Sequence, residues 1–416
     1  MSKRVVVTGF GVITPFGCGA EAIKENAFQG IHGFKPISSF DTSTAVAKRG
    51  GEAPVSPRSY RAFARYCTEQ ALAMAGLDVQ RDAQLLRQAA VAVGNLGEGA
   101  ILREFYAQFQ PVPEMSPADS AGAAAAAEAR RTAFATADGE TLPIHDANPF
   151  AHAEAIAEHI GSEGPQLAFT NACIASANAI GYGFDQIRKG RTDCALVGGL
   201  NVLHPQVFFN FDSSRAMADD VVRPFSQGRT GLLIGDGAAI LVLESLESAQ
   251  RRGATVLAEM LGWGISSDGF HVSQPEPNGN GLARSMRMAL RKAGCAIEEI
   301  DYINAHGTGT PLNDRSETKA YKQVFGDYAN NVPISSTKSM TGHMLEATGG
   351  VEAVISILAL LEQTIPPTAN YAGPEEELDL DYVVEGARRK PLRTVMSNSS
   401  AFGGNNCTLL FRREEA

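Results

Sequence analysis

The stretch that most constrains this chain is residues 166–190, QLAFTNACIASANAIGYGFDQIRKG. The apolar run Leu167-Ala168-Phe169 predicts a short buried strand, and Asn171 and Ala172 predict a turn directly after it. The apolar positions that follow recur at steps of four and three and share one helical face: Cys173, Ala177, Ile180, Phe184 and Ile187. A strand that passes through a tight turn into a buried helix is typical of an α/β protein.

Cys173 lies where the predicted strand gives way to the helix. Free N–H groups and the positive end of the helix dipole at this position favour a thiolate and offer donors to an oxyanion. The alternative is a small apolar cysteine in a core helix, and this stretch alone leaves both interpretations open. Gly181 and Gly183 within the helix predict close approach of another backbone.

Strands and helices alternate along the whole chain, which predicts parallel sheets covered by helices. The pattern restarts near Gly253, so we expect two βα-rich halves, residues 1–253 and 254–416, related by internal duplication. Residues around 105–146 interrupt the first half as an insertion with a short alanine-rich helix at 121–129. Further predictions are helices at Tyr60–Ala75 and 150–160 and a strand at Leu380–Val384.

Composition limits the class of protein. The net charge of −10 argues against a nucleic-acid binder, and 44% hydrophobic with 20% charged residues indicates a compact globular chain. The six cysteines show neither CxxC pairs nor zinc spacing. We find no signal peptide and no apolar run of membrane-spanning length, and we therefore expect a soluble cytoplasmic protein.

Three loops carry further reactive or small side chains directly after predicted strands. They are NAHGTGTP at 304–311, SSTKSMTGH at 335–343 and SNSSAFGGNN at 397–406. Each alone could be a capping histidine, a surface lysine or a glycine turn. Ligand sites of α/β proteins lie at the carboxyl ends of strands, however, and two of these loops contain a histidine, His306 and His343. Together with Cys173 they favour nucleophilic acyl transfer.

These motifs resemble the elongating β-ketoacyl-[acyl-carrier-protein] synthases of the thiolase superfamily. The resemblance covers nearly the whole chain, from VVVTGFGVITP through Cys173, RPF, GLLIGDGAA, NAHGTGTPLND, SSTKSMTGH and IPPT to SNSSAFGGNN. It implies a thiolase-like α/β fold of two duplicated halves in five layers, αβαβα. It also implies a decarboxylative Claisen condensation between a cysteine-bound acyl chain and malonyl-carrier protein, in fatty acid or type II polyketide or polyene biosynthesis.

The resemblance also implies roles for residues. Cys173 would be the nucleophile, and His306 and His343 would stabilise the enolate. The N–H groups of Cys173 and Phe402 would form an oxyanion hole for the bound acyl group, while Lys338 and Glu317 would position the histidines. In some relatives the matching positions line a monovalent-cation site, here Asn304, Glu352, Ser397 and Asn398. No cofactor is expected beyond the 4′-phosphopantetheine that arrives on the acyl carrier protein.

The chain departs from the family pattern at two loops. In the gate loop, Ser400 replaces an aromatic residue, Ala401 a glycine and Asn405 a threonine. After His343 the family's small GAAG becomes Glu346-Ala347-Thr348-Gly349. These changes put an ordinary saturated fatty chain in doubt and favour a specialised substrate.

Two other functions compete with condensation. A degradative thiolase would carry a second cysteine in its C-terminal loop, where this chain has Phe402-Gly403-Gly404. A catalytically silent, chain-length-factor-like subunit would lack Cys173. A homodimer and a heterodimer with such a paralogue both stay open.

Two groups of surface and pocket residues follow from the resemblance. An open acyl-pocket floor is predicted at Gly97, which would suit a long or rigid acyl chain; the alternative is that Glu98 or a partner subunit fills this space. Docking of the acidic carrier protein needs local basic side chains, and the candidates are Arg58, Arg61, Arg65 and Arg215. The first three fall on one helical face, which could equally be an ordinary solvated face. We expect no nucleic-acid or membrane partner.

Overall fold

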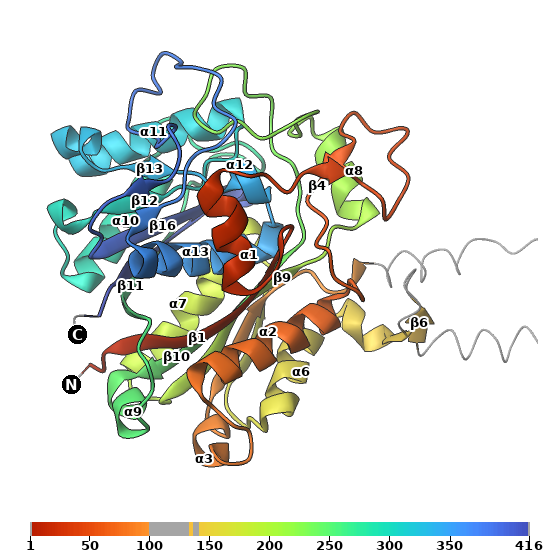
Figure 1. Ribbon diagram of the computed structural model, residues 1–416, viewed down its shortest axis with the longest axis vertical. Coiled ribbons are helices and arrows are strands. Elements are labelled where there is room, and N and C mark those ends of the chain that lie inside the picture. Colours follow the sequence, from red (N-terminus) through yellow and green to blue (C-terminus); the bar gives the residue numbers. More distant parts are fainter. Residues whose placement is uncertain (1, 100–132, 136–140, 415–416) are drawn as a thin grey trace, which may run out of the picture.

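The computed structural model describes residues 2–99, 133–135 and 141–414. The predicted helix at 121–129 and most of the predicted insertion at 105–146 lie outside these residues. The described chain forms one large mixed sheet with helices on both faces (Figure 1).

The first half contributes five strands in the spatial order β8-β5-β9-β10-β1. Their bounds are β1 Val5–Thr14, β5 Ala90–Gly94, β8 Gln166–Phe169, β9 Cys194–Asn201 and β10 Gly237–Ser245. The second half contributes β13-β12-β16-β17-β11. Their bounds are β11 Ala258–Ser267, β12 Tyr302–Asn304, β13 Ile334–Ser335, β16 Thr394–Ser400 and β17 Asn405–Arg412. If the strands of each half are counted along the chain, both halves have the order third, second, fourth, fifth, first.

The prediction of parallel sheets is correct only for the outer strands. β5 is parallel to β8 and β9, and β12 is parallel to β13 and β16. The inner pairs β9–β10, β10–β1, β11–β17 and β17–β16 are antiparallel, and so is the pair β1–β11 that joins the halves. Strands buried on both faces have the same apolar sequence in either direction, so the pattern could not distinguish the two cases.

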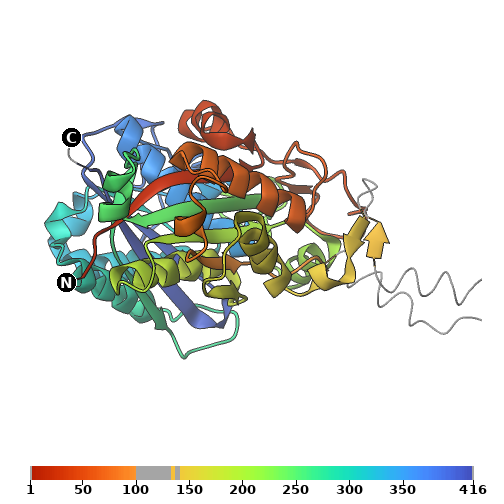
Figure 2. The same ribbon diagram turned by 90° about the horizontal axis from the view of Figure 1, so that it is seen from below.

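The helices complete five layers, which Figures 1 and 2 show from two sides. α2 and α6 cover the outer face of the first half, and α10 and α11 cover the outer face of the second. α7 and α13 lie between the two half-sheets. The bounds are α2 Tyr60–Ala75, α6 Phe150–Ile160, α7 Ala175–Arg188, α10 Asn280–Ala293, α11 Pro311–Phe325 and α13 Thr348–Glu362.

Shorter elements complete the described chain. The helices are α1 Gly19–Asn26, α3 Ala83–Leu86, α8 Pro205–Ser213, α9 Leu246–Arg251 and α12 Lys338–Thr341. The strands are β2 Gly17–Cys18, β3 Lys35–Pro36, β4 Arg49–Gly50, β6 Ala133–Ala135, β7 Thr141–Pro143, β14 Thr364–Ile365 and β15 Arg388–Arg389. The segment 380–384, predicted as a strand, is irregular, and Val383 has a left-handed φ of 49° that interrupts extended backbone.

The predicted buried stripe is confirmed for Ala177, Ile180, Phe184 and Ile187 of α7, and Cys173, in the turn just before α7, is buried as well. The reason given for the α7 glycines is wrong. A Cβ at Gly181 would lie 2.3 Å from the ring of Trp263, and one at Gly183 would lie 2.5 Å from Cγ1 of Val197. Side chains of neighbouring strands, rather than another backbone, fill the space beside this helix.

Candidate active site

Cys173 lies in a strained turn between β8 and α7. The turn is a 3₁₀ segment, Ala172–Ile174, and Ala172 has φ of 58°, a left-handed conformation that costs a non-glycine residue of order 1–2 kcal/mol. The turn packs against a second 3₁₀ segment, Leu345–Ala347, and against α13. The surrounding structure therefore fixes the direction in which the thiol points.

Burial raises the pKa of the Cys173 thiol to about 12, and the nearby Glu346 carboxyl adds to the rise. Lys338 and the backbone N–H groups of Cys173 and Phe402 act in the opposite direction. The expectation that the helix terminus favours a thiolate is therefore outweighed by desolvation, and the resting thiol is protonated. The same two N–H groups are those to which the resemblance assigned an oxyanion hole, and both act to lower the pKa of the Cys173 thiol.

His306 follows β12 and is held by its backbone. The carboxylate of Glu317 accepts the N–H groups of His306 and Gly307, each at 2.7 Å, and the hydroxyl of Tyr321 at 2.6 Å. The His306 side chain is buried, and its Nδ1 has no hydrogen-bond partner. Burial, with Lys338 and His343 nearby, holds the pKa of His306 well below its ordinary value, so the ring is neutral at neutral pH.

His343 presents a defined tautomer. Its Nδ1 accepts the backbone N–H of Leu345 at 3.0 Å and lies 3.0 Å from the hydroxyl of Thr348. An N–H can only donate, so Nδ1 carries no proton and the neutral ring carries its proton on Nε2. Burial, followed by Lys338, holds the pKa of His343 well below its ordinary value. The rings of His306 and His343 are 5.3 Å apart and nearly perpendicular.

Behind the histidines, Lys338 forms a fully buried ion pair with Glu352, with Nζ 2.6 Å from Oε1. Burial raises the pKa of Glu352 to about 7. A lysine that is inaccessible to solvent cannot contact substrate directly. It instead supplies the positive charge that disfavours protonation of both imidazoles.

The predicted cation-site residues are partly brought together. Asn304 and Ser397 are paired across β12 and β16, and both the Asn304 amide and Oε2 of Glu352 are buried without a hydrogen-bond partner. The side-chain oxygen of Asn398, in contrast, already accepts the hydroxyl of Thr408 at 2.7 Å. Among the described residues, no group of three or more His, Cys, Asp and Glu side chains is suited to a metal. The cation site stays a prediction.

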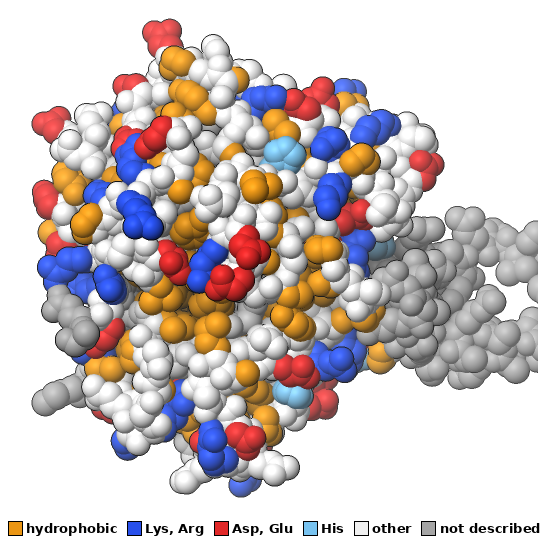
Figure 3. Space-filling model, viewed as in Figure 1, with side chains coloured by type: hydrophobic (Ala, Val, Ile, Leu, Met, Phe, Trp, Pro, Cys, Tyr) orange, Lys and Arg blue, Asp and Glu red, His pale blue; other side chains and the backbone are white. Residues whose placement is uncertain are grey.

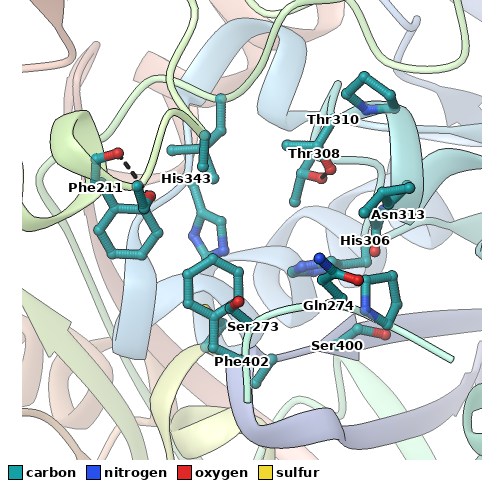
Figure 4. A pocket seen from close by; sticks show the side chains of 18 of the residues that line it. Phe211, Ser273, Gln274, His306, Thr308, Thr310, Asn313, His343, Ser400 and Phe402 are labelled. Carbon is teal, nitrogen blue, oxygen red and sulfur yellow. Dashed lines mark hydrogen bonds between the residues drawn. The ribbon is translucent and has the colours of Figure 1, made fainter. Parts of the chain in front are cut away.

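The reactive side chains meet at a cavity of about 290 Å³. Figure 4 shows His343 and Phe211 on one side and His306, Thr308, Thr310 and Asn313 on the other. Phe402 stacks on Phe211 with ring centroids 5.4 Å apart, and it is 40% exposed.

The gate loop carries three of the predicted departures from the family pattern, Ser400, Ala401 and Asn405. The hydroxyl of Ser400 donates to Asn406 at 2.8 Å, and the N–H of Ala401 donates to the carbonyl of Asn405 at 2.8 Å. Ser400 and Ala401 thus close a tight hairpin between β16 and β17, and both line the cavity.

The sequence interpretation missed several lining residues. Phe211, Thr308 and Thr310 were not singled out, although both threonines belong to the His306 loop. The bond from Thr348 to His343 was also missed, because a substitution by itself gives no direction for its side chain.

The prediction of open space at Gly97 is wrong. Gly97 has φ of 80°, and a Cβ there would lie 2.2 Å from the carbonyl oxygen of Ala147. Glycine is therefore required by the backbone and by close packing, and Gly97 does not line the cavity around Cys173.

The prediction that four arginines dock the carrier protein also needs correction for two of them. Arg58 pairs with Asp236 at 2.8 Å and Glu52 at 3.1 Å, and Arg61 forms a bidentate pair with the buried Asp146. These guanidinium groups are engaged by acids of the same chain, which argues against a docking role.

The other two candidates differ. The side chain of Arg65 is 75% exposed and lies 3.8 Å from Glu69. Arg215 follows α8 and lines the cavity.

Comparison with known proteins agrees with this geometry. The chain matches the family models described as Beta-ketoacyl synthase, N-terminal domain, over residues 2–249, and Beta-ketoacyl synthase, C-terminal domain, over residues 257–372. The chain belongs to the β-ketoacyl synthase family.

A curated member of this family, 3-oxoacyl-[acyl-carrier-protein] synthase 2 of Synechocystis sp., is 35% identical, and the match covers 99% of this chain and 98% of the relative. Among solved structures, the ishigamide ketosynthase/chain length factor is 35% identical with a TM-score of 0.86, and both chains are covered fully. A type II polyketide synthase acyl-carrier protein in complex with its ketosynthase is 28% identical with a TM-score of 0.88, again with full coverage. No helix in the described part of the chain is long and apolar enough to cross a membrane.

Proposed function

We propose that this protein is a decarboxylating condensing enzyme, a 3-oxoacyl-[acyl-carrier-protein] synthase. The observation that carries the proposal is the convergence of Cys173, His306 and His343 on one cavity, with the pKa values of both imidazoles held low. Two neutral rings can each offer one N–H to an oxygen that gains negative charge.

In the first half-reaction, the sulfur of Cys173 attacks the thioester carbonyl of acyl-carrier protein. The carbonyl oxygen becomes an oxyanion near the N–H groups of Cys173 and Phe402. The pantetheine thiolate leaves, and the thiol proton lost by Cys173 ends on that sulfur. Because the pKa of the resting thiol is raised to about 12, proton removal must accompany the attack.

In the second half-reaction, malonyl-carrier protein occupies the same cavity. Loss of CO₂ leaves an enolate whose oxygen accepts hydrogen bonds from His306 and from Nε2–H of His343. The α-carbon then attacks the carbonyl of the Cys173 thioester and the C–S bond breaks. The sulfur leaves as a thiolate that takes up a proton from solvent, and the product leaves as 3-oxoacyl-carrier protein. A low imidazole pKa suits this role, because both rings stay neutral donors at neutral pH.

The substrates are proposed to arrive on 4′-phosphopantetheine of an acyl carrier protein, with no further cofactor. The hydroxyls of Thr308 and Thr310 and the guanidinium of Arg215 lie at the cavity, where they suit a phosphate-bearing arm. Figure 3 shows basic side chains over the corner formed by α8 and β4, which suits an acidic carrier. Arg215→Glu should slow turnover with carrier-bound substrate more than with a pantetheine thioester, and equal losses would exclude this docking role.

The decisive experiment compares wild type, Cys173→Ala and Cys194→Ala. Cys194 is also buried and lies in β9, so its substitution is the matched control. Wild type and Cys194→Ala should gain the mass of one acyl group from acyl-carrier protein and release CO₂ from malonyl-carrier protein. Cys173→Ala should neither become acylated nor form the condensation product. Rapid cleavage of 3-oxoacyl-CoA without CO₂ release would instead indicate a thiolase, and an unreactive wild type would indicate a silent subunit.

The proposal extends to the kind of acyl primer and to the oligomeric state. The gate departures Ser400 and Ala401 favour a specialised, unsaturated primer, and a panel of saturated and polyunsaturated acyl-carrier proteins tests this. We propose a dimer with either a second copy or a chain-length-factor-like paralogue. A chain that is dimeric and active when purified alone would exclude the need for the paralogue.

A further inference from the structure

The loop after His343 carries the departure Glu346-Ala347-Thr348-Gly349, and one of its side chains reaches a catalytic ring. Thr348 is the first residue of α13 and is fully buried. Its hydroxyl oxygen lies 3.0 Å from Nδ1 of His343. An alanine at this position, as in the family pattern, would leave Nδ1 with the backbone N–H of Leu345 alone.

The direction of the Thr348 hydrogen bond follows from the backbone. Leu345 N–H donates to Nδ1, so that nitrogen presents its lone pair and has no hydrogen to offer to Thr348. The hydroxyl must therefore donate to the same nitrogen. Two donors on Nδ1 withdraw electron density from the ring, which makes Nε2–H a stronger hydrogen-bond donor and disfavours the imidazolium form.

We propose that Thr348 is a positioning residue that fixes and polarises His343, so that Nε2–H stabilises the enolate more strongly than it would beside an alanine. The inference rests on the proposed condensing function, because it assigns Thr348 a part in the decarboxylation step. We expect Thr348 to have no part in self-acylation of Cys173, because the oxyanion of that step would be stabilised by backbone N–H groups.

Other titratable groups near His343 could also affect the pH–rate profile, so they must be the same in wild type and in the Thr348 variants. The titratable groups that act on His343 or line its cavity are Lys338, paired with Glu352, together with His306, Cys173 and Arg215, and Glu346 lies three residues along the chain. All of them remain in a Thr348 variant. A change in the pH profile on substitution of Thr348 is therefore attributable to the lost hydroxyl.

The experiment uses Thr348→Val, which keeps the shape and removes the hydroxyl, Thr348→Ala, and Thr348→Ser, which keeps the hydroxyl. Thr68→Val is the matched control, since Thr68 in α2 is buried and its hydroxyl has no hydrogen-bond partner. Thr348→Val and Thr348→Ala should slow malonyl decarboxylation about 5-fold, the worth of one neutral hydrogen bond. They should also move the acid limb of the pH–rate profile to higher pH. Self-acylation should change less than 2-fold, and Thr348→Ser should behave like wild type.

A second readout does not depend on the reaction. In protein labelled with ¹⁵N-histidine, the Nδ1 resonance of His343 should shift in Thr348→Val and return in Thr348→Ser. If Nδ1 is unchanged in Thr348→Val, or if both half-reactions slow equally, the proposal is overturned. If wild type releases no CO₂ but Nδ1 still responds, the proposed function fails while the contact between Thr348 and His343 stands.

Discussion

The two halves of the molecule share a strand order but use it differently. In each half the third strand, β8 or β13, leads through a turn towards the central helix, α7 or α13. The first half places Cys173 there, and the second places Lys338 and His343. The second strand of each half, β5 or β12, leads into a glycine-containing loop, and only the loop after β12 carries a catalytic candidate, His306.

The halves also hold their reactive groups by different means. The first half orients Cys173 with backbone strain at Ala172 and with burial. In the second half, the backbone N–H of His306 donates to Glu317, and Leu345 and Thr348 contact Nδ1 of His343. The charge of Lys338 acts on both rings. A nucleophile needs one direction and a sulfur that can lose its proton, whereas histidines that donate hydrogen bonds to an enolate would need a proton on the nitrogen that faces it. The same scaffold therefore serves both tasks because loops, rather than strands, carry the differences.

The largest predicted effect separates the halves functionally. His343→Ala should lower malonyl decarboxylation by about 10²–10³, the usual worth of one oxyanion donor, while acylation of Cys173 continues. Release of CO₂ and the mass of the acyl-enzyme measure the two steps separately. Equal losses in both would mean that His343 supports the nucleophile half as well and would break the comparison.

A smaller effect is expected at Glu346, where the second half packs against the nucleophile turn. Glu346 is buried, its Oε2 has no partner, and burial raises its pKa from 4.5 to about 7. The folded protein thus keeps a proton that the unfolded chain releases between those values, so stability falls as pH rises through this window.

Glu346→Gln removes this ionisation. The variant should be more stable than wild type at pH 8 by on the order of 3 kcal/mol, with the difference vanishing towards pH 4.5. Urea unfolding across pH measures it. Glu362→Gln, at an exposed carboxylate of α13, is the control. If the difference in unfolding free energy between Glu346→Gln and wild type is the same at every pH, Glu346 is not held protonated.

The smallest effect concerns two glycines of the first half, Gly97 in the loop after β5 and Gly161 at the end of α6. Gly97→Ala should destabilise the protein by about 2 kcal/mol, because it adds a clash with Ala147 to an unfavourable positive φ. Gly161 also has positive φ but open space around it, so Gly161→Ala should cost only about 1 kcal/mol. Thermal denaturation compares the two. Equal losses of stability in the two variants, or an altered preference for acyl chain length in Gly97→Ala, would contradict the conclusion that Gly97 is closely packed and lies outside the acyl pocket.

The sequence predicted best what depends on local periodicity. The helices Tyr60–Ala75 and 150–160 were placed to the residue, because apolar spacing and terminal glycines mark their ends. Cys173, His306 and His343 were found from strand-end loops and motif resemblance. Strand direction was not predictable, since both directions bury the same side chains.

Long-range partners were also out of reach. The pairs that engage Arg58 and Arg61 join residues 178 and 85 positions apart, and no local pattern reports them. The same holds for Ala147 beside Gly97. The bond from Thr348 to His343 spans only five positions, but it depends on a turn whose shape is set by the packing of both halves.

Strand β1 has a consequence for how the chain can be assembled. Val5 pairs with Ser245 in β10 and with Met260 in β11, so this strand, once synthesised, waits for partners 240 and 255 residues later. Contacts of such sequence separation slow folding, and an unpaired apolar strand invites aggregation during the delay. We therefore expect Val5–Thr14 to need protection during synthesis until β10 and β11 have been made.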